Sequence, residues 1–139
     1  MTAAAYLAIA LPSHATWTTF PAGGGGHLRG AILSGMGLRK GWPDIQILVR
    51  ESAYDTIRAM SRFIGLECKA KTGRLSEDQE KCHALIRNAG GEVYVVRTLE
   101  EIYDALANKE RLKLKALPLM APSGAADNVR ILKRRIAKQ

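Results

Sequence analysis

Residues 41–79 read GWPDIQILVRESAYDTIRAMSRFIGLECKAKTGRLSEDQ. Two apolar runs, residues 45–49 and 63–66, are typical of buried strands. Asp44 stands directly before the first run, and Glu67 and Lys69 follow the second. Because side chains alternate along a strand, Glu67 and Lys69 project from one face and Cys68 from the other. If the two strands are neighbours, Asp44 meets Glu67 and Lys69 at one end of the sheet.

Two carboxylates and an amine at one place have two interpretations. Convergent carboxylates suit a hard divalent cation such as Mg²⁺, which retains waters and is shared with phosphate. A lysine beside such an ion orients the attacking water and offsets charge on the phosphate oxygens. The alternative is a turn aspartate beside an exposed ion pair at a strand end. Pro-Asp followed by Glu-x-Lys occurs in many unrelated chains, so the triplet alone favours this alternative.

The sequence around the triplet extends the pattern. A glycine-rich approach, GLRKGWPD, occupies residues 37–44, and GRLSEDQ follows Glu-x-Lys at residues 73–79. A strand-like GGEVYVVR and a helical segment close the pattern over residues 90–106. With these four ordered motifs, roughly residues 18–106 resemble the virus-type replication-repair nuclease (VRR-NUC) domain of the PD-(D/E)xK nuclease superfamily.

The resemblance implies an α/β fold of the restriction-endonuclease type, a mixed central sheet flanked by helices. It also implies an Mg²⁺-dependent (or Mn²⁺-dependent) endonuclease that cuts structured or branched DNA in phage or bacterial replication and repair. Asp44, Glu67 and the backbone carbonyl of Cys68 would bind the metal, and Lys69 would position the water. Gln79 would either cap its helix or also set Lys69 and the scissile phosphate. The alternative function is a non-catalytic DNA-binding accessory protein with the same fold.

The chain departs from the family pattern at two places. Members often carry a glutamate on the first helix as a further metal ligand, but no Asp or Glu precedes Asp44 here. The family's Asn-Gly-Gly-like segment is replaced by a run of glycines at residues 23–26, which lacks the asparagine. The number of metal ions is therefore left open.

Periodicity and capping residues predict the remaining elements. Ser76 with Gln79, and Thr98 with Glu101, form capping boxes at two helix starts. Cys82, Leu85, Ile86 and Ala89 are expected on one apolar stripe, with His83 off it and solvated. Residues 51–61 are expected to be helical or irregular. The first two strands are expected to be antiparallel, and the strands at residues 63–66 and 92–97 parallel. The expected helices span residues 2–10, 28–36, 76–88 and 98–108, and the expected strands residues 17–20, 45–49, 63–66 and 92–97.

The size of the chain fits one domain, and its charge favours a polyanionic partner, nucleic acid first and an anionic membrane surface second. The 139 residues are 47% hydrophobic and 24% charged, which is typical of a globular chain. The formal net charge is +8, of which residues 110–139 carry +6, with eight basic residues against Glu110 and Asp127. We therefore expect a nuclease domain over residues 1–109 and a basic extension over 110–139, either a solvated tail or a DNA contact. The candidate DNA-binding residues are His27, Arg29, Arg39, Lys40, Lys71, Arg74, Arg130, Lys133, Arg134 and Arg135.

The expected partners are DNA and a second copy of the chain, because one site cuts one strand at a time and a twofold dimer cuts both. No membrane and no small-molecule cofactor are expected. The apolar start, residues 1–11, is too short to span a bilayer and has no basic residue before it. Two cysteines, Cys68 and Cys82, form no close metal or redox motif and fit reduced cytosolic thiols. Together with the family resemblance, this implies the cytoplasm of a bacterial or phage-infected cell.

Overall fold

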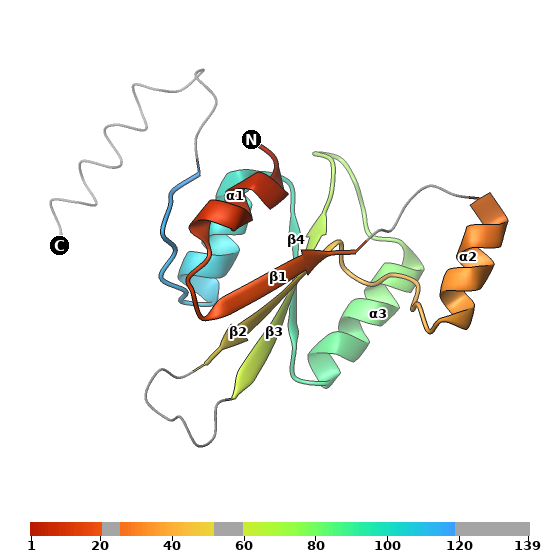
Figure 1. The fold of residues 1–139 in the computed structure, drawn as a ribbon. Coiled ribbons are helices and arrows are strands. Elements are labelled where there is room, and N and C mark those ends of the chain that lie inside the picture. The colour runs from red at the N-terminus through yellow and green to blue at the C-terminus, as the bar shows by residue number, and fades with distance from the viewer. Residues whose placement is uncertain (21–25, 52–59, 119–139) are drawn as a thin grey trace, which may run out of the picture.

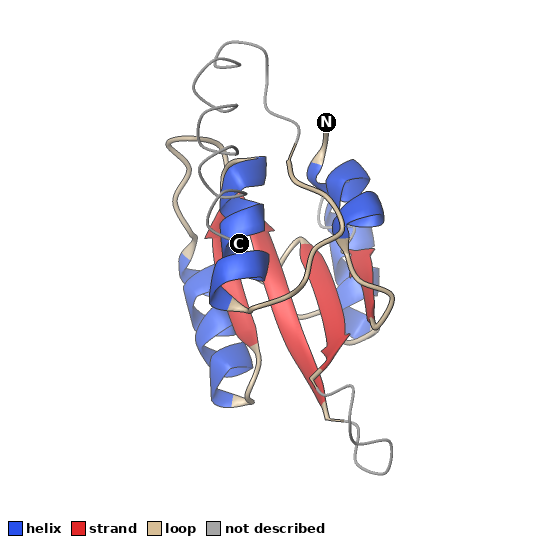
Figure 2. Cartoon of the chain, turned by 90° about the vertical axis from the view of Figure 1, so that its left-hand side faces the viewer, coloured by secondary structure: helices blue, strands red, loops and turns tan. Residues whose placement is uncertain are grey.

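The computed structural model describes residues 1–20, 26–51 and 60–118. A four-stranded mixed sheet in the order β1-β2-β3-β4 lies at the centre, with helices on both of its faces (Figures 1 and 2). The α/β class predicted from the sequence is confirmed. The elements are α1 (Ala3–Ala10), β1 (Ala15–Thr19), α2 (Gly26–Gly35), β2 (Ile45–Arg50), β3 (Ser61–Cys68), α3 (Glu77–Asn88), β4 (Glu92–Val96), α4 (Leu99–Tyr103) and a π-helical turn η1 (Asp104–Lys109).

The strand pairing follows the predicted pattern. β1 with β2 and β2 with β3 are antiparallel, whereas β3 and β4 are parallel and are joined through α3. Ile45 pairs with Leu66, so Asp44 before β2 lies beside Glu67 near the end of β3. This register brings together two acidic residues that are far apart in the sequence.

One face of the sheet carries the main apolar core. Inward-facing residues of β2 and β3, such as Ile47 and Ile64, pack there against α1, α4 and η1. In Figure 1, α1 in red and the cyan helix after β4 lie on this side, and α3 lies on the other. The buried members of this core are Tyr6, Leu7, Ala10, Leu11, Ile45, Ile47, Val49, Ile64, Leu66, Val96, Ile102, Leu106 and Leu112.

Several element boundaries differ from the prediction. β3 begins at Ser61, and the Glu51 N–H donates to the Met60 carbonyl at 2.9 Å, which continues the antiparallel pairing of β2 and β3. The predicted helical or irregular segment, residues 51–61, therefore ends too late, because Ser61 already belongs to β3. Residues 52–59 of this segment lie outside the described residues. The last predicted helix, residues 98–108, is α-helical only as far as Tyr103 (α4). From Asp104 the chain continues as the π-helical turn η1.

The chain beyond residue 109 continues along the apolar core. Leu112 is buried there, the Lys115 N–H donates to the Ala10 carbonyl at 2.7 Å, and the Tyr6 hydroxyl donates to the Ala116 carbonyl at 2.9 Å. Residues up to Ala116 thus fasten α1 to the sheet, and the boundary at residue 109 stays a prediction. In the described residues, no helix has the length and apolar character to span a membrane.

Candidate active site

Two glycines allow the loop before β2 to lie close to its neighbours. Gly41 has φ of +79°, and a Cβ there would lie 2.3 Å from the Asp78 carbonyl oxygen at the start of α3. Pro43 is buried against Gly65, where a Cβ would lie 2.6 Å from its ring. A side chain at either glycine would push the loop away. The Gly-Trp-Pro-Asp sequence therefore positions Asp44 between β3 and the start of α3.

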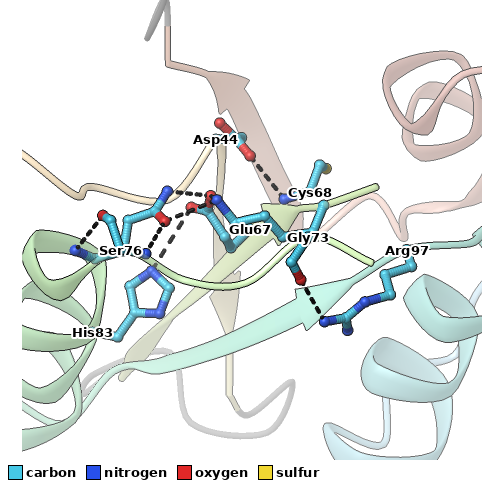
Figure 3. Close-up of polar contacts among 9 residues, drawn as sticks. Asp44, Glu67, Cys68, Gly73, Ser76, His83 and Arg97 are labelled. Carbon is cyan, nitrogen blue, oxygen red and sulfur yellow. Dashed lines mark hydrogen bonds and ion pairs between the residues drawn. The ribbon is translucent and has the colours of Figure 1, made fainter. Parts of the chain in front are cut away.

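Asp44 is fastened directly to β3. The Cys68 N–H donates to Asp44 Oδ2 at 2.7 Å (Figure 3). This bond holds the carboxylate beside the backbone of Cys68, the residue whose carbonyl is the predicted backbone ligand. The Cys68 side chain itself is exposed and lies on the opposite face of β3 from Glu67, as predicted from strand alternation.

Glu67 is a charged residue in the interior, with only 1% of its surface exposed. Its Oε1 accepts hydrogen bonds from Lys69 Nζ at 3.0 Å and from Gln79 Nε2 at 2.5 Å. Burial raises the pKa of Glu67 and nearby Asp44 raises it further, while the bonds from Lys69 and Gln79 oppose this shift. The two donors therefore help to keep a buried carboxylate ionised.

Gln79 both caps its helix and contacts Lys69, while its predicted action on the scissile phosphate stays a prediction. Its Oε1 accepts from the Ser76 N–H at 3.0 Å, and the Gln79 N–H donates to Ser76 Oγ at 3.3 Å, which completes the predicted capping box. The same Oε1 accepts from Lys69 Nζ at 2.8 Å. The helix cap thus fixes the side chain that lies between Glu67 and Lys69.

His83 lies at the site, and the prediction that it is solvated is wrong. It is 1% exposed, and its Nε2 is 3.8 Å from Glu67 Oε2 (Figure 3). Burial lowers the pKa of His83, and the nearby positive charges of Arg87 and Lys69 lower it further. The missed signal is the spacing, since His83 follows Gln79 by four residues and shares its helix face.

The predicted apolar stripe of α3 is correct only in part. Cys82 and Ile86 pack with Val93, Trp42 and Phe63, whereas Leu85 and Ala89 are exposed. The helix is rotated so that His83, rather than Leu85, points toward the sheet. A polar residue occupies this inward position because Glu67 lies opposite to it.

The model of the VRR-NUC domain family matches residues 26–99, more than half of the chain. The chain belongs to the VRR-NUC family. Searches of curated proteins and of solved structures returned no match. The matched residues include α2, the Gly-Trp-Pro-Asp loop, both central strands, α3 and β4. The family is one of nuclease domains, which agrees with the resemblance inferred from the sequence motifs.

The loop that follows β3 is also fixed within the VRR-NUC domain. Arg97 Nη2 donates to the Gly73 carbonyl at 3.0 Å, which ties this loop to the end of β4 (Figure 3). Lys71 and Arg74 on the loop are exposed, as required of residues that contact DNA. His27, Arg39 and Lys40 are exposed as well, whereas the Arg29 side chain, Arg130, Lys133, Arg134 and Arg135 lie outside the described residues.

The VRR-NUC site offers few but suitable metal ligands. Within residues 1–20, 26–51 and 60–118, no three His, Cys, Asp or Glu side chains gather in a metal-binding group. Two carboxylates and one carbonyl nevertheless suit Mg²⁺, which is commonly bound through one or two carboxylates and keeps several waters. Glu67 Oε2 is buried and accepts no hydrogen bond from the part of the chain that the structure describes, so the carboxylate has acceptor capacity to spare there. The donor set therefore fits a hard divalent cation.

Proposed function

We propose that the protein is a metal-dependent DNA endonuclease that hydrolyses phosphodiester bonds in structured or branched DNA during phage or bacterial replication and repair. The observation that supports this most strongly is the gathering of Asp44, Glu67, Lys69 and Gln79 where β2 begins and β3 ends. Lys69 Nζ lies 3.0 Å from Glu67 Oε1 and 2.8 Å from Gln79 Oε1. Membership of the VRR-NUC family supports the same chemistry.

Asp44, Glu67 and the Cys68 carbonyl would hold Mg²⁺ or Mn²⁺. When bound, the cation supplies Lewis-acid polarisation of the phosphate and lowers the pKa of a coordinated water. The chain's own contribution is to fix these ligands in advance. The Cys68 N–H holds the Asp44 carboxylate, and Lys69 with Gln79 holds the Glu67 carboxylate.

Lys69 is placed to position a water or a phosphate oxygen. An ammonium group has three donors, and Glu67 and Gln79 take two of them. The third donor is left for the reacting groups, and 18% of the side-chain surface is exposed to receive them. Because two acceptors hold the ammonium group, it does not need to reorganise when negative charge develops on the phosphate.

Cleavage assays with two site variants test the proposal. Purified protein is incubated with labelled linear, flap and four-way DNA in Mg²⁺, Mn²⁺ or chelator. Glu67→Gln keeps the side-chain shape but removes the charge that binds the cation, so cleavage should fail or need far more metal. Lys69→Ala should cut about 10²–10³-fold more slowly even at saturating metal, because the interaction of Lys69 with the reacting groups matters mainly in the transition state.

Lys81→Ala is the matched control, because Lys81 is an exposed lysine on α3 that pairs with Glu77 at the surface. It should cut at the wild-type rate, and all three variants should still bind DNA. If the wild type is inert on every substrate with either cation, or both site variants cut normally, the active-site assignment is wrong. A non-catalytic DNA-binding accessory protein would then be the better description.

Cutting both strands of a duplex or junction calls for two sites, and we infer a twofold homodimer. A dimer places two copies of the Asp44–Glu67–Lys69 site on opposite strands. Sedimentation velocity at micromolar concentration, with and without DNA, should give the mass of two chains. A monomer under both conditions would contradict this assembly.

A further inference from the structure

Helix α3 presents two side chains, one turn apart, to the two oxygens of one carboxylate. Gln79 Nε2 donates to Glu67 Oε1 at 2.5 Å, and His83 Nε2 lies 3.8 Å from Glu67 Oε2. Residues four apart on a helix share a face, so the same packing of α3 against β3 places both of them. Figure 3 shows the imidazole of His83 directed at Glu67 from the helix.

Two buried atoms that are unpaired in the described part of the chain, Glu67 Oε2 and His83 Nε2, face each other at this contact. Among the described residues, four buried side-chain nitrogen or oxygen atoms have no hydrogen-bond partner, and three of them are Glu67 Oε2 and the two ring nitrogens of His83. Buried polar groups in folded proteins are nearly always paired, so such a group calls for an explanation. A separation of 3.8 Å is too long for a hydrogen bond. The carboxylate torsion of a glutamate is broad, however, and a small rotation closes a gap of this size.

We propose that His83 is a positioning residue of the metal site, whose Nε2–H donates to Glu67 Oε2 and, together with Gln79 on Oε1, sets the carboxylate in its cation-binding orientation. This inference rests on the proposed nuclease function. A carboxylate has about four acceptor sites. Lys69, Gln79 and His83 would occupy three of them, which leaves one for the cation.

The chemistry of the imidazole supports positioning rather than ligation. A neutral imidazole carries one N–H, and the ring nitrogen that faces Glu67 Oε2 is Nε2, at 3.8 Å. With Nε2 as the donor, the ring can satisfy the orphaned oxygen without adding a charge. Metal-ligating carboxylates are themselves commonly hydrogen-bonded, and loss of such an outer partner typically weakens metal binding.

Metal titration of the full-length protein without DNA tests the role. Mn²⁺ binding is measured by electron paramagnetic resonance for the wild type, His83→Met, His83→Gln and Ile86→Val. Met fills the space of the imidazole but cannot donate a hydrogen bond to Glu67, so the affinity for Mn²⁺ should fall about 10–100-fold. Gln carries an N–H close to the position of Nε2 and should restore most of the affinity. Ile86→Val, a buried change on the same helix that does not touch the site, should bind as the wild type does.

The tautomer of His83 provides a second measurement, because a purely structural role would not require the ring hydrogen to be on Nε2. Long-range ¹H–¹⁵N spectra should show His83 protonated at Nε2, and the Nε2 shift should move in Glu67→Gln. Wild-type affinity in His83→Met, or a proton on Nδ1, would overturn the inference and leave a buried core histidine. Equal loss in His83→Gln and His83→Met would also overturn it, because the imidazole itself would then be a ligand.

The failure of the proposed function has a different signature. If the wild type binds no Mn²⁺, or Glu67→Gln binds it equally well, the metal site is absent and the proposed function fails. If Glu67→Gln loses binding while His83→Met keeps it, only the role of His83 is wrong.

Discussion

The two faces of the sheet are built from alternate residues of the same strands, but they bury different kinds of side chain. Ile47 and Ile64 point into the apolar core under α1, α4 and η1. On the other face, β3 presents Glu67 to α3, and only a small apolar cluster around Cys82, Ile86 and Val93 packs there. At the far end of this face Leu48 remains 48% exposed.

The apolar face stabilises the fold, and the face under α3 carries the candidate site. Burying apolar area stabilises a fold, whereas burying a carboxylate and an imidazole costs free energy that hydrogen bonds only partly offset. A site of this kind requires a neighbouring region that is stable enough to hold it. The apolar face has that role here, and α3 is free to carry polar residues such as Gln79 and His83 inward.

The largest expected effect comes from truncating the apolar face. Ile47→Ala removes a fully buried side chain from β2 and should lower the free energy of unfolding by about 2–5 kcal/mol. Leu48→Ala is the matched control, because Leu48 is the next residue of the same strand on the other face and is half exposed. It should cost less than about 1 kcal/mol. Urea unfolding followed by circular dichroism measures both, and equal losses would refute the contrast between the faces.

A smaller effect is expected from the polar contacts at the edge of the apolar face. Buried Glu110 accepts from Arg62 and from the Tyr94 hydroxyl, and these contacts hold the end of η1 against β3 and β4. Glu110→Gln removes the charge and should cost about 2 kcal/mol, since Arg62 then keeps only its longer ion pair with the more exposed Glu51, at 3.9 Å.

The control is Asp104→Asn, in a surface pair with Lys109 at 3.7 Å, which should change the unfolding free energy by less than about 0.5 kcal/mol. The same urea unfolding experiment compares the two variants. If the Glu110 variant is as stable as the wild type, the polar contacts do not fasten the end of the core.

The smallest effect on stability is expected at the site, where Glu67→Gln should change the unfolding free energy by about 1 kcal/mol or less at neutral pH. The sign of this change in unfolding free energy depends on pH. The pKa of Glu67 is raised above its ordinary 4.5, so the folded state binds the proton more tightly than the unfolded state. The wild type should therefore lose stability relative to the variant as pH rises above 4.5 toward the folded-state pKa.

This comparison is made in chelator, because a bound cation would reverse the charge balance at Glu67. The measurement is the urea midpoint of both proteins from pH 4 upward. A wild type that gains stability over the variant through that range would show that the hydrogen bonds from Lys69 and Gln79 outweigh the desolvation of Glu67.

Local features of the sequence were sufficient to predict most elements and the meeting of Asp44, Glu67 and Lys69 at one end of the sheet. Strand alternation placed Glu67 and Lys69 on one face, and the order Pro-Asp then Glu-x-Lys indicated which strands meet. The Ser76–Gln79 capping box was also predicted, because it depends on residues only three apart. These features are short-range, and short-range geometry follows directly from backbone periodicity.

The second capping box shows where local prediction ends. Thr98 Oγ1 accepts from the Glu101 N–H at 3.2 Å, as predicted. The Glu101 carboxylate, however, takes the Arg97 N–H at 2.7 Å instead of completing the box at Thr98. The motif gives the start of the helix, but the partner of its acidic residue depends on how the chain enters from β4.

The sequence by itself determined the fold class, the order of the elements and the family, because these depend on periodicity and on motifs of a few residues. Only the tertiary structure decided the rotation of α3 against the sheet, which buries His83 and exposes Leu85. It alone placed residues 110–116 along the apolar core, where the Lys115 N–H meets the Ala10 carbonyl. The physical reason is common to both cases. From hydrophobicity alone, a histidine or a charged segment is expected to be exposed. Whether it is buried depends on the residues that it packs against, and these are distant in the sequence.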